Sequence, residues 1–368
     1  MTIRSITGRL ASQVVLTWRS RFGKWAIGLV MAWGALAPLP VGAQGLIPLD
    51  WPCDVVALGT DLELDRAPVV TGLALQPGGS HVAVVGDDHF VRLCDRQTGN
   101  LLFKLEGHRD WIRKAEFTPD GRWLITAGND RRVIKWNPAT GTLVSVLRES
   151  SFAVSALAIE PSGRIAALGG FSGTIQLIDL NDGRVVREIP SPCPDIRALD
   201  FSADGLLLAA GGRDGQVRIW NAQDGELIAE LAAHSRRIRD LDFLAGDRAV
   251  VTCGEDLMIH VSDLDDSNRS FRIDSRPAKV LTLERLDGDL LASAGSDNRI
   301  RIWDLKERRE IGELTGHEGS VAALAFDGTR LYSAGYDTHL RIWRVNANFA
   351  STDATRPRIS RQPGSILD

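Results

Sequence analysis

The chain lacks the short motifs that mark most catalytic and metal-binding proteins. Among its 368 residues there are four cysteines but no Cys-x-x-Cys spacing, which argues against a structural zinc site. There is also no phosphate-binding glycine loop, no His-Glu-x-x-His and no Gly-x-Ser-x-Gly. The net charge of -4 offers no basic excess for binding nucleic acid. We therefore expect no catalytic residue, no metal, no cofactor and no nucleic-acid partner.

Acidic side chains are missing from the first 43 residues, which contain several arginines followed by an uncharged run from 25 to 43. The strongly apolar part of that run is shorter than a membrane span, and it ends in the small residues before Gln44. This pattern predicts a signal peptide over residues 1–43 and an exported chain, periplasmic or secreted. The alternative is an uncleaved anchor, because the whole uncharged run approaches the length of a membrane span.

What the chain does have is a strong internal repeat. A dipeptide that ends a short apolar strand recurs about every 40 residues. Its copies are Cys94-Asp95, Trp136-Asn137, Ile178-Asp179, Trp220-Asn221, Ser262-Asp263, Trp303-Asp304 and Trp343-Arg344. Alternating segments and glycine turns such as "PDG" and "ADG" separate the copies, so each unit is predicted to hold about four short strands.

A four-stranded antiparallel sheet repeated radially is a propeller blade. We therefore predict an all-β fold, a seven-bladed β-propeller over residues 54–347, after a linker at 44–53 and before a disordered tail at 348–368. The last unit lacks an outer strand, and residues 54–61 resemble the outer strands of the other units. An N-terminal strand is thus expected to close the ring of four-stranded antiparallel blades.

The motifs Gly107-His108, Gly316-His317 and Ile302-Trp303-Asp304 resemble the tryptophan-aspartate (WD) repeat family of β-propellers. The resemblance covers about residues 54–346. It implies a structural hydrogen-bond chain of histidine, hydroxyl, aspartate and tryptophan within a blade. The matching residues are His108, Thr126, Asp130 and Trp136 in the second unit and His317, Ser333, Asp337 and Trp343 in the last. The fifth unit keeps His234, Thr252 and Asp256 but has Ser262 in place of tryptophan.

The resemblance also implies a non-enzymatic, monomeric protein-interaction scaffold. Its partner is expected on the face formed by loops that enter the first strand and leave the second strand of each blade. Alignment of the units places Trp111, Arg113, Phe171, Arg197, Arg213, Arg237, Arg239 and Tyr336 on this face. Because arginine and exposed aromatics are enriched at binding hot spots, we hypothesise an acidic protein or peptide partner, with Trp111 as an apolar anchor. The alternative is a solvated rim in which the arginines pair with Asp195 and Glu255.

Two other classes of function stay open at this point. A quinoprotein- or lactonase-like propeller would hold a ligand or metal in its central channel, and Glu116, Asp200, Asp242 and Glu284 lie on the predicted innermost strands. No histidine joins them there. A structural envelope or anchoring protein would require the N-terminal segment to be retained, and only then is a membrane expected as a partner.

Overall fold

The structure is a computed structural model that describes residues 48–59, 68–244 and 246–345. The signal peptide predicted at 1–43 and the tail predicted at 348–368 lie outside these residues. The described part is all-β apart from one short 3₁₀ turn, Ser267–Arg269. None of its helices is long and apolar enough to cross a membrane.

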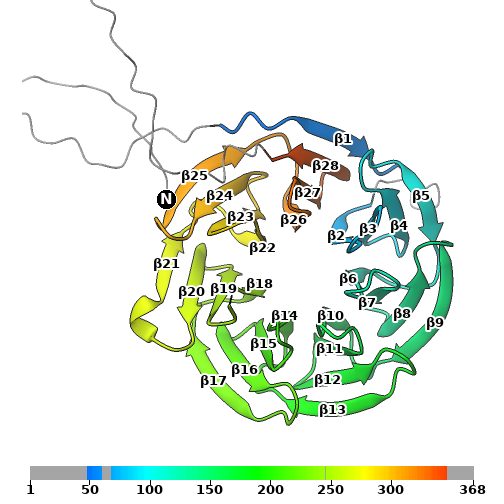
Figure 1. The fold of residues 1–368 in the computed structure, drawn as a ribbon, viewed down its shortest axis with the longest axis horizontal. Helices are drawn as coiled ribbons and strands as arrows, with labels where there is room; N and C mark the ends of the chain where they lie inside the picture. Colours follow the sequence, from blue (N-terminus) through cyan, green and yellow to red (C-terminus); the bar gives the residue numbers. More distant parts are fainter. Residues whose placement is uncertain (1–47, 60–67, 245, 346–368) are drawn as a thin grey trace, which may run out of the picture. The chain divides into compact units, whose positions relative to one another are not determined.

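The strands form seven four-stranded antiparallel sheets, the blades of a propeller (Figure 1). The innermost strand of each blade is largely buried. In order, these strands are β2 (Val70–Leu75), β6 (Ile112–Phe117), β10 (Val154–Ile159), β14 (Ile196–Phe201), β18 (Ile238–Phe243), β22 (Val280–Arg285) and β26 (Val321–Phe326). Each contacts the innermost strands of both neighbouring blades, so the ring is closed around a central channel.

The second and third strands of each blade are the most deeply buried. The second strands are β3 (His81–Gly86), β7 (Leu124–Gly128), β11 (Ile165–Gly170), β15 (Leu207–Gly212), β19 (Ala249–Gly254), β23 (Leu290–Gly295) and β27 (Arg330–Gly335). The third strands are β4 (Val91–Asp95), β8 (Arg132–Asn137), β12 (Thr174–Asp179), β16 (Gln216–Asn221), β20 (Met258–Asp263), β24 (Ile300–Asp304) and β28 (His339–Arg344). The core therefore lies inside the blades and between them.

The outer strands are the most exposed of each blade, as expected of strands with one face on solvent. Those of the first six blades are β5 (Leu101–Leu105), β9 (Thr142–Glu149), β13 (Val185–Pro190), β17 (Leu227–Ala232), β21 (Phe271–Asp274) and β25 (Arg309–Leu314). In the seventh blade the outer position belongs to β1 (Cys53–Ala57), which pairs antiparallel with β28 from Cys53 opposite Trp343 to Ala57 opposite His339.

Apolar side chains fill the spaces between neighbouring blades. Trp136 of the second blade, for example, packs in one buried cluster with Val91 and Leu93 of the first. Full burial of one such side chain contributes about 1.5–3 kcal/mol, so each blade depends on its neighbours for much of its stability. Of the residues assigned to the linker, Trp51 is buried with the cores of the sixth and seventh blades, and the Leu49 amide donates to the Glu313 carbonyl at 2.9 Å.

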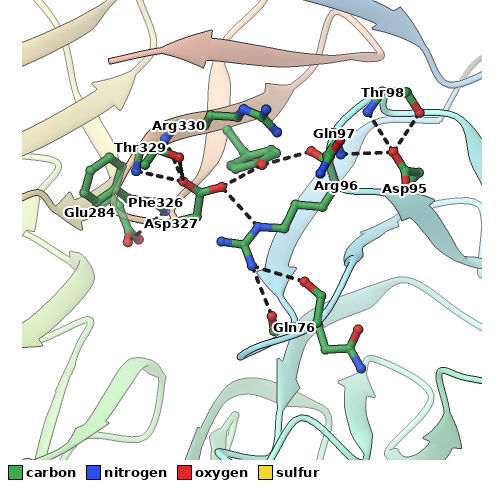
Figure 2. Close-up of polar contacts among 12 residues, drawn as sticks. Gln76, Asp95, Arg96, Gln97, Thr98, Glu284, Phe326, Asp327, Thr329 and Arg330 are labelled. Atoms are coloured by element: carbon green, nitrogen blue, oxygen red, sulfur yellow. Dashed lines mark hydrogen bonds and ion pairs between the residues drawn. The ribbon is translucent and has the colours of Figure 1, made fainter. Parts of the chain in front are cut away.

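Polar contacts add to the seam between the seventh and first blades (Figure 2). The Arg96 Nε lies 3.0 Å from the Asp327 Oδ2, and the Tyr332 hydroxyl lies 2.9 Å from both that oxygen and the Arg96 carbonyl oxygen. Burial by itself raises the pKa of Asp327, but hydrogen bonds from Thr329, the Arg330 amide and Tyr332 outweigh it and lower the pKa to about 2. The carboxylate is therefore ionised, and it ties β27 to the turn after β4.

Candidate partner-binding mouth of the central channel

A β-bulge occurs at the same place in all seven innermost strands. In each of these strands, the residue at the second position has no partner on the second strand of the blade. In β6, for example, this residue is Arg113, between Ile112 and Lys114. A bulge re-aims the side chain of the unpaired residue. The seven bulge residues, which we call the mouth ring, are Thr71, Arg113, Ser155, Arg197, Arg239, Leu281 and Ala322, and together they line one pocket at an opening of the channel.

Two further residues complete this pocket, Lys114 next to a bulge and Tyr336 on the loop after β27. The pocket therefore brings three arginines and a lysine together from the second, fourth and fifth blades. Burial lowers the pKa of Arg113, and the positive charges of Arg197 and Arg239 lower it further. These three guanidinium groups line the same pocket, where an anion can approach them together.

The turns that carry this opening depend on the Gly-x-Asp repeat. At Gly128, which ends β7, an added Cβ would lie 2.3 Å from the Trp111 carbonyl oxygen, and at Gly295 it would lie 1.8 Å from that of Lys279. Both distances are far inside van der Waals contact. Glycine is needed there because the loop entering the first strand lies directly against the end of the second strand.

Two acidic residues are shared among three of the predicted arginines. Arg197 and Arg237 both pair with Asp195, at 2.6 and 3.1 Å. Arg237 and Arg239 both pair with Glu255, at 3.3 and 3.4 Å. The alternative of a self-paired rim thus describes part of the surface, yet three guanidinium groups share two carboxylates.

The predicted aromatic residues are exposed around the same opening. Trp111 is 39% exposed, Phe171 52% and Tyr336 54%. The Arg113 guanidinium lies over the Trp111 ring at 4.7 Å, and that of Arg197 over the Phe171 ring at 4.5 Å. These pairs are cation–π contacts, and they link the aromatic side chains to the mouth ring.

The remaining predicted residue, Arg213, is exposed on the turn after β15, and its amide donates to the Asp195 carbonyl at 3.0 Å. It does not line the pocket. Arg113 differs from the other arginines because its Nε donates to the neutral amide oxygen of Asn129, at 2.9 Å, and not to a carboxylate. Among the three mouth-ring arginines, Arg113 is therefore the one with a neutral acceptor, whereas Arg197 and Arg239 pair with carboxylates.

In four of the innermost strands, the residue three positions after the mouth-ring residue is acidic. Glu116, Asp200, Asp242 and Glu284, which we call the inner ring, line one pocket inside the channel with Asp240. Burial raises the pKa of Glu116 to about 8 and that of Asp200 to about 7, and it raises the pKa values of Asp242 and Glu284 well above the usual range. The side chains face the channel but are surrounded by protein, so at neutral pH the cluster retains protons.

The inner ring also bonds neighbouring blades. Glu116 accepts the Ile159 amide at 3.1 Å, Asp200 accepts the Phe243 amide at 2.7 Å, and Glu284 accepts the Phe326 amide at 3.1 Å. Figure 2 shows the last of these contacts. In each case the donor belongs to the next blade, so these carboxyl groups have a structural use that a catalytic or metal-binding group would not need.

The histidines implied by the family resemblance are buried within the blades. In the second blade, Trp136 Nε1 donates to Thr126 Oγ1 at 2.8 Å, His108 Nε2 lies 2.7 Å from the same oxygen, and His108 Nδ1 lies 2.9 Å from Asp130 Oδ2.

The seventh blade repeats the arrangement with distances of 2.8, 2.7 and 2.8 Å among Trp343, Ser333, His317 and Asp337. These side chains are buried within their own blades. They are therefore available for stability and not for contact with a partner.

Two charged channel residues were not singled out from the sequence. Lys114 Nζ lies 3.8 Å from Asp240 Oδ1, a pairing between the second and fifth blades across the channel. Both residues stand at the same position of their units, next to the bulge, so alignment of the units contains the signal. All four cysteines are free thiols, and Cys94, Cys193 and Cys253 are buried.

Comparison with known proteins agrees with this architecture. Five stretches match the family model described as WD domain, G-beta repeat, at residues 99–137, 183–221, 225–263, 286–304 and 308–344. Each stretch ends at or near the dipeptide that defines the repeat. The chain belongs to the WD-repeat family of β-propellers, a class that typically provides scaffolds for protein–protein interaction.

Individual relatives share only short stretches with the chain. The U3 small nucleolar RNA-associated protein 21 homolog of Schizosaccharomyces pombe is 33% identical over 92 residues, which is 25% of this chain and 10% of that protein. Human WD repeat and SOCS box-containing protein 1 is 33% identical over 76 residues, 20% of this chain and 18% of the relative. Schistosoma mansoni WD repeat-containing protein SL1-17 is 36% identical over 75 residues, which is 20% of this chain and 25% of that protein. The matches thus cover a quarter or less of each relative.

Proposed function

We propose that the chain is a non-enzymatic scaffold that binds an acidic segment of a partner protein over the mouth of its central channel. The observation that carries this proposal is the pocket lined by Arg113, Lys114, Arg197 and Arg239, with exposed aromatic residues around it. Guanidinium groups bind carboxylates through two parallel hydrogen bonds, so several of them in one pocket favour an anionic ligand.

The existing ion pairs leave capacity for such a ligand. Asp195 and Glu255 each contact two arginines, so each guanidinium group receives only part of a carboxylate. Arg113 has only the neutral Asn129 oxygen as its hydrogen-bond acceptor at Nε. An acidic peptide would supply the missing negative charge, and Trp111 would add apolar contact beside it.

The alternative of a channel enzyme receives less support from the geometry. Glu116, Asp200 and Glu284 accept backbone amides of the next blade, which explains their positions without a substrate. The scaffold therefore remains the function that the arrangement supports best.

The test uses a fluorescein-labelled oligoglutamate peptide and an oligoglutamine peptide of the same length. We expect the wild-type chain to bind the first and not the second, with an affinity that falls as salt is added. In the variant Arg113→Gln, Arg197→Gln, Arg239→Gln, binding should be at least about tenfold weaker. Arg248→Gln is the control, because Arg248 lies exposed on the loop after β18 and pairs with Asp265 on the loop after β20. Equal binding by the triple variant and the wild type would reject the proposal.

A further inference from the structure

The fifth blade differs from four others at one buried position of its third strand. In the first, fourth, sixth and seventh blades an arginine at this position pairs with the aspartate of the Gly-x-Asp turn or its equivalent. The pairs are Arg92 with Asp88, Arg218 with Asp214, Arg301 with Asp297, and Arg341 with Asp337. In the fifth blade the residue is His260, and the aspartate is Asp256. Asp256 has thus lost the guanidinium group that its counterparts keep.

His260 places a second imidazole next to that of His234. The rings of His234 and His260 have centroids 4.4 Å apart, and His234 Nδ1 lies 2.8 Å from Asp256 Oδ1. The potential ligand atoms of the three residues all lie within 4.8 Å of one another. Both histidines are buried, at 6% and 5% exposure. Two imidazoles and one carboxylate are a donor set that zinc uses.

The missing tryptophan also matters. In the seventh blade the indole of Trp343 can only donate, so it occupies a lone pair of the Ser333 hydroxyl, which then donates to His317 Nε2. In this arrangement His317 carries its proton on Nδ1, facing Asp337.

Ser262 replaces the tryptophan in the fifth blade, so no indole N–H occupies the Thr252 hydroxyl there. The Thr252 hydroxyl, 2.9 Å from His234 Nε2, can accept a proton from that nitrogen instead. A metal ion at Nδ1 would then take the place of the proton that this nitrogen otherwise shares with Asp256 at 2.8 Å.

Space and solvent access are available next to His260. His260 and Ser262 line a pocket together with Ala232, Phe271 and Arg272. Of the three residues, His260 thus lies against this pocket. One charge opposes a cation, since Arg272 is paired with His260 in the register of β21 against β20. Arg272 is exposed, so its effect is screened by solvent.

We propose that His234, Asp256 and His260 form a binding site for a divalent transition-metal ion of the zinc class, with water in the fourth position. Thr252 would orient His234 from behind. Ligands of a tetrahedral zinc are about 3.3 Å apart when the bonds are about 2.0 Å, so the ion would separate His234 Nδ1 from Asp256 slightly. The site would brace the turn that carries Glu255, the partner of Arg237 and Arg239.

The experiment is a titration of chelator-treated full-length chain with Zn²⁺, followed by calorimetry, and with Co²⁺, followed by the visible absorption of four-coordinate cobalt. We expect one Zn²⁺ per chain with micromolar or tighter affinity, a higher melting temperature with zinc, and no response to Mg²⁺. His260→Arg restores the residue of the other blades, so it should fold normally and lose zinc binding at least about a hundredfold. His89→Asn is the control and should keep zinc binding. His89 has a φ of 68°, a conformation that asparagine tolerates.

A second variant separates metal binding from structure. Arg272→Ala removes only the opposing charge, so zinc should bind about two- to fivefold more tightly. Unchanged or weaker binding in this variant, no saturable binding by the wild type, or full binding by His260→Arg would each overturn the site.

Discussion

The mouth ring and the inner ring lie on the same innermost strands, three residues apart, but they differ in charge and in what they contact. The mouth ring presents Arg113, Arg197 and Arg239. The last two pair with carboxylates, and the first two lie over exposed aromatic rings. The inner ring presents Glu116 and Glu284, with Asp200 and Asp242, and three of its members accept amides of the next blade. The cationic side chains at the opening therefore line a pocket, whereas the carboxyl groups inside the channel join neighbouring blades.

The largest expected effect on stability comes from removing an inner-ring acceptor. Glu284→Ala leaves the Phe326 amide without its partner, so the free energy of unfolding should fall by about 1–3 kcal/mol. Denaturant unfolding at neutral pH measures this. Glu284→Gln keeps an oxygen that can accept the same amide and removes only the ionisable group. It should therefore be at least as stable as the wild type, and a loss as large as that of the alanine variant would refute the role given to this contact.

The next effect is the pH dependence of stability set by the inner ring. The pKa of Glu116 is raised from 4.5 to about 8, so the folded chain holds this proton more tightly than the unfolded chain. The stability that results is fully present below about pH 4.5 and is lost as the pH rises through about 8.

Glu116→Gln removes this dependence. The difference in melting temperature between variant and wild type should therefore change in favour of the variant as the pH rises from 6 to 8. A constant difference across that range would contradict the raised pKa. The same comparison with Arg113→Gln, at the mouth, should show little change with pH.

The smallest effect is expected at the aromatic edge of the mouth. Trp111→Ala removes the ring under the Arg113 guanidinium, a contact worth about 0.5–1 kcal/mol at an exposed site. Binding of the oligoglutamate peptide should weaken by about two- to fivefold. Leu143→Ala, at another exposed apolar residue on β9, should leave the affinity unchanged. Equal effects of the two substitutions would show that Trp111 has no special part in binding.

Much of the fold follows from local features of the sequence. The repeated dipeptide and the glycine turns set the strand boundaries, because a residue such as Gly128 fits where no side chain can. The inner-ring carboxylates could also be placed on the innermost strands from the sequence. Their amide donors, such as Phe243 for Asp200, could not be identified, because they belong to another blade.

The site was harder to predict for a physical reason. The bulges re-aim Arg113 and Arg239, and the ion pairs of Asp195 depend on how the fourth and fifth blades meet. His260 stands where other units have arginine, so alignment could have found it. Its distance from His234, however, depends on side-chain packing within the blade.

The most direct test of the separation between the two rings measures peptide binding and unfolding on two variants side by side. One carries Arg113→Gln, Arg197→Gln and Arg239→Gln, and the other carries Glu116→Ala and Glu284→Ala. The account predicts that the first loses oligoglutamate binding by at least about tenfold and keeps its unfolding free energy within about 1 kcal/mol, while the second keeps the affinity and loses stability. Loss of stability without loss of binding in the mouth variant would contradict it.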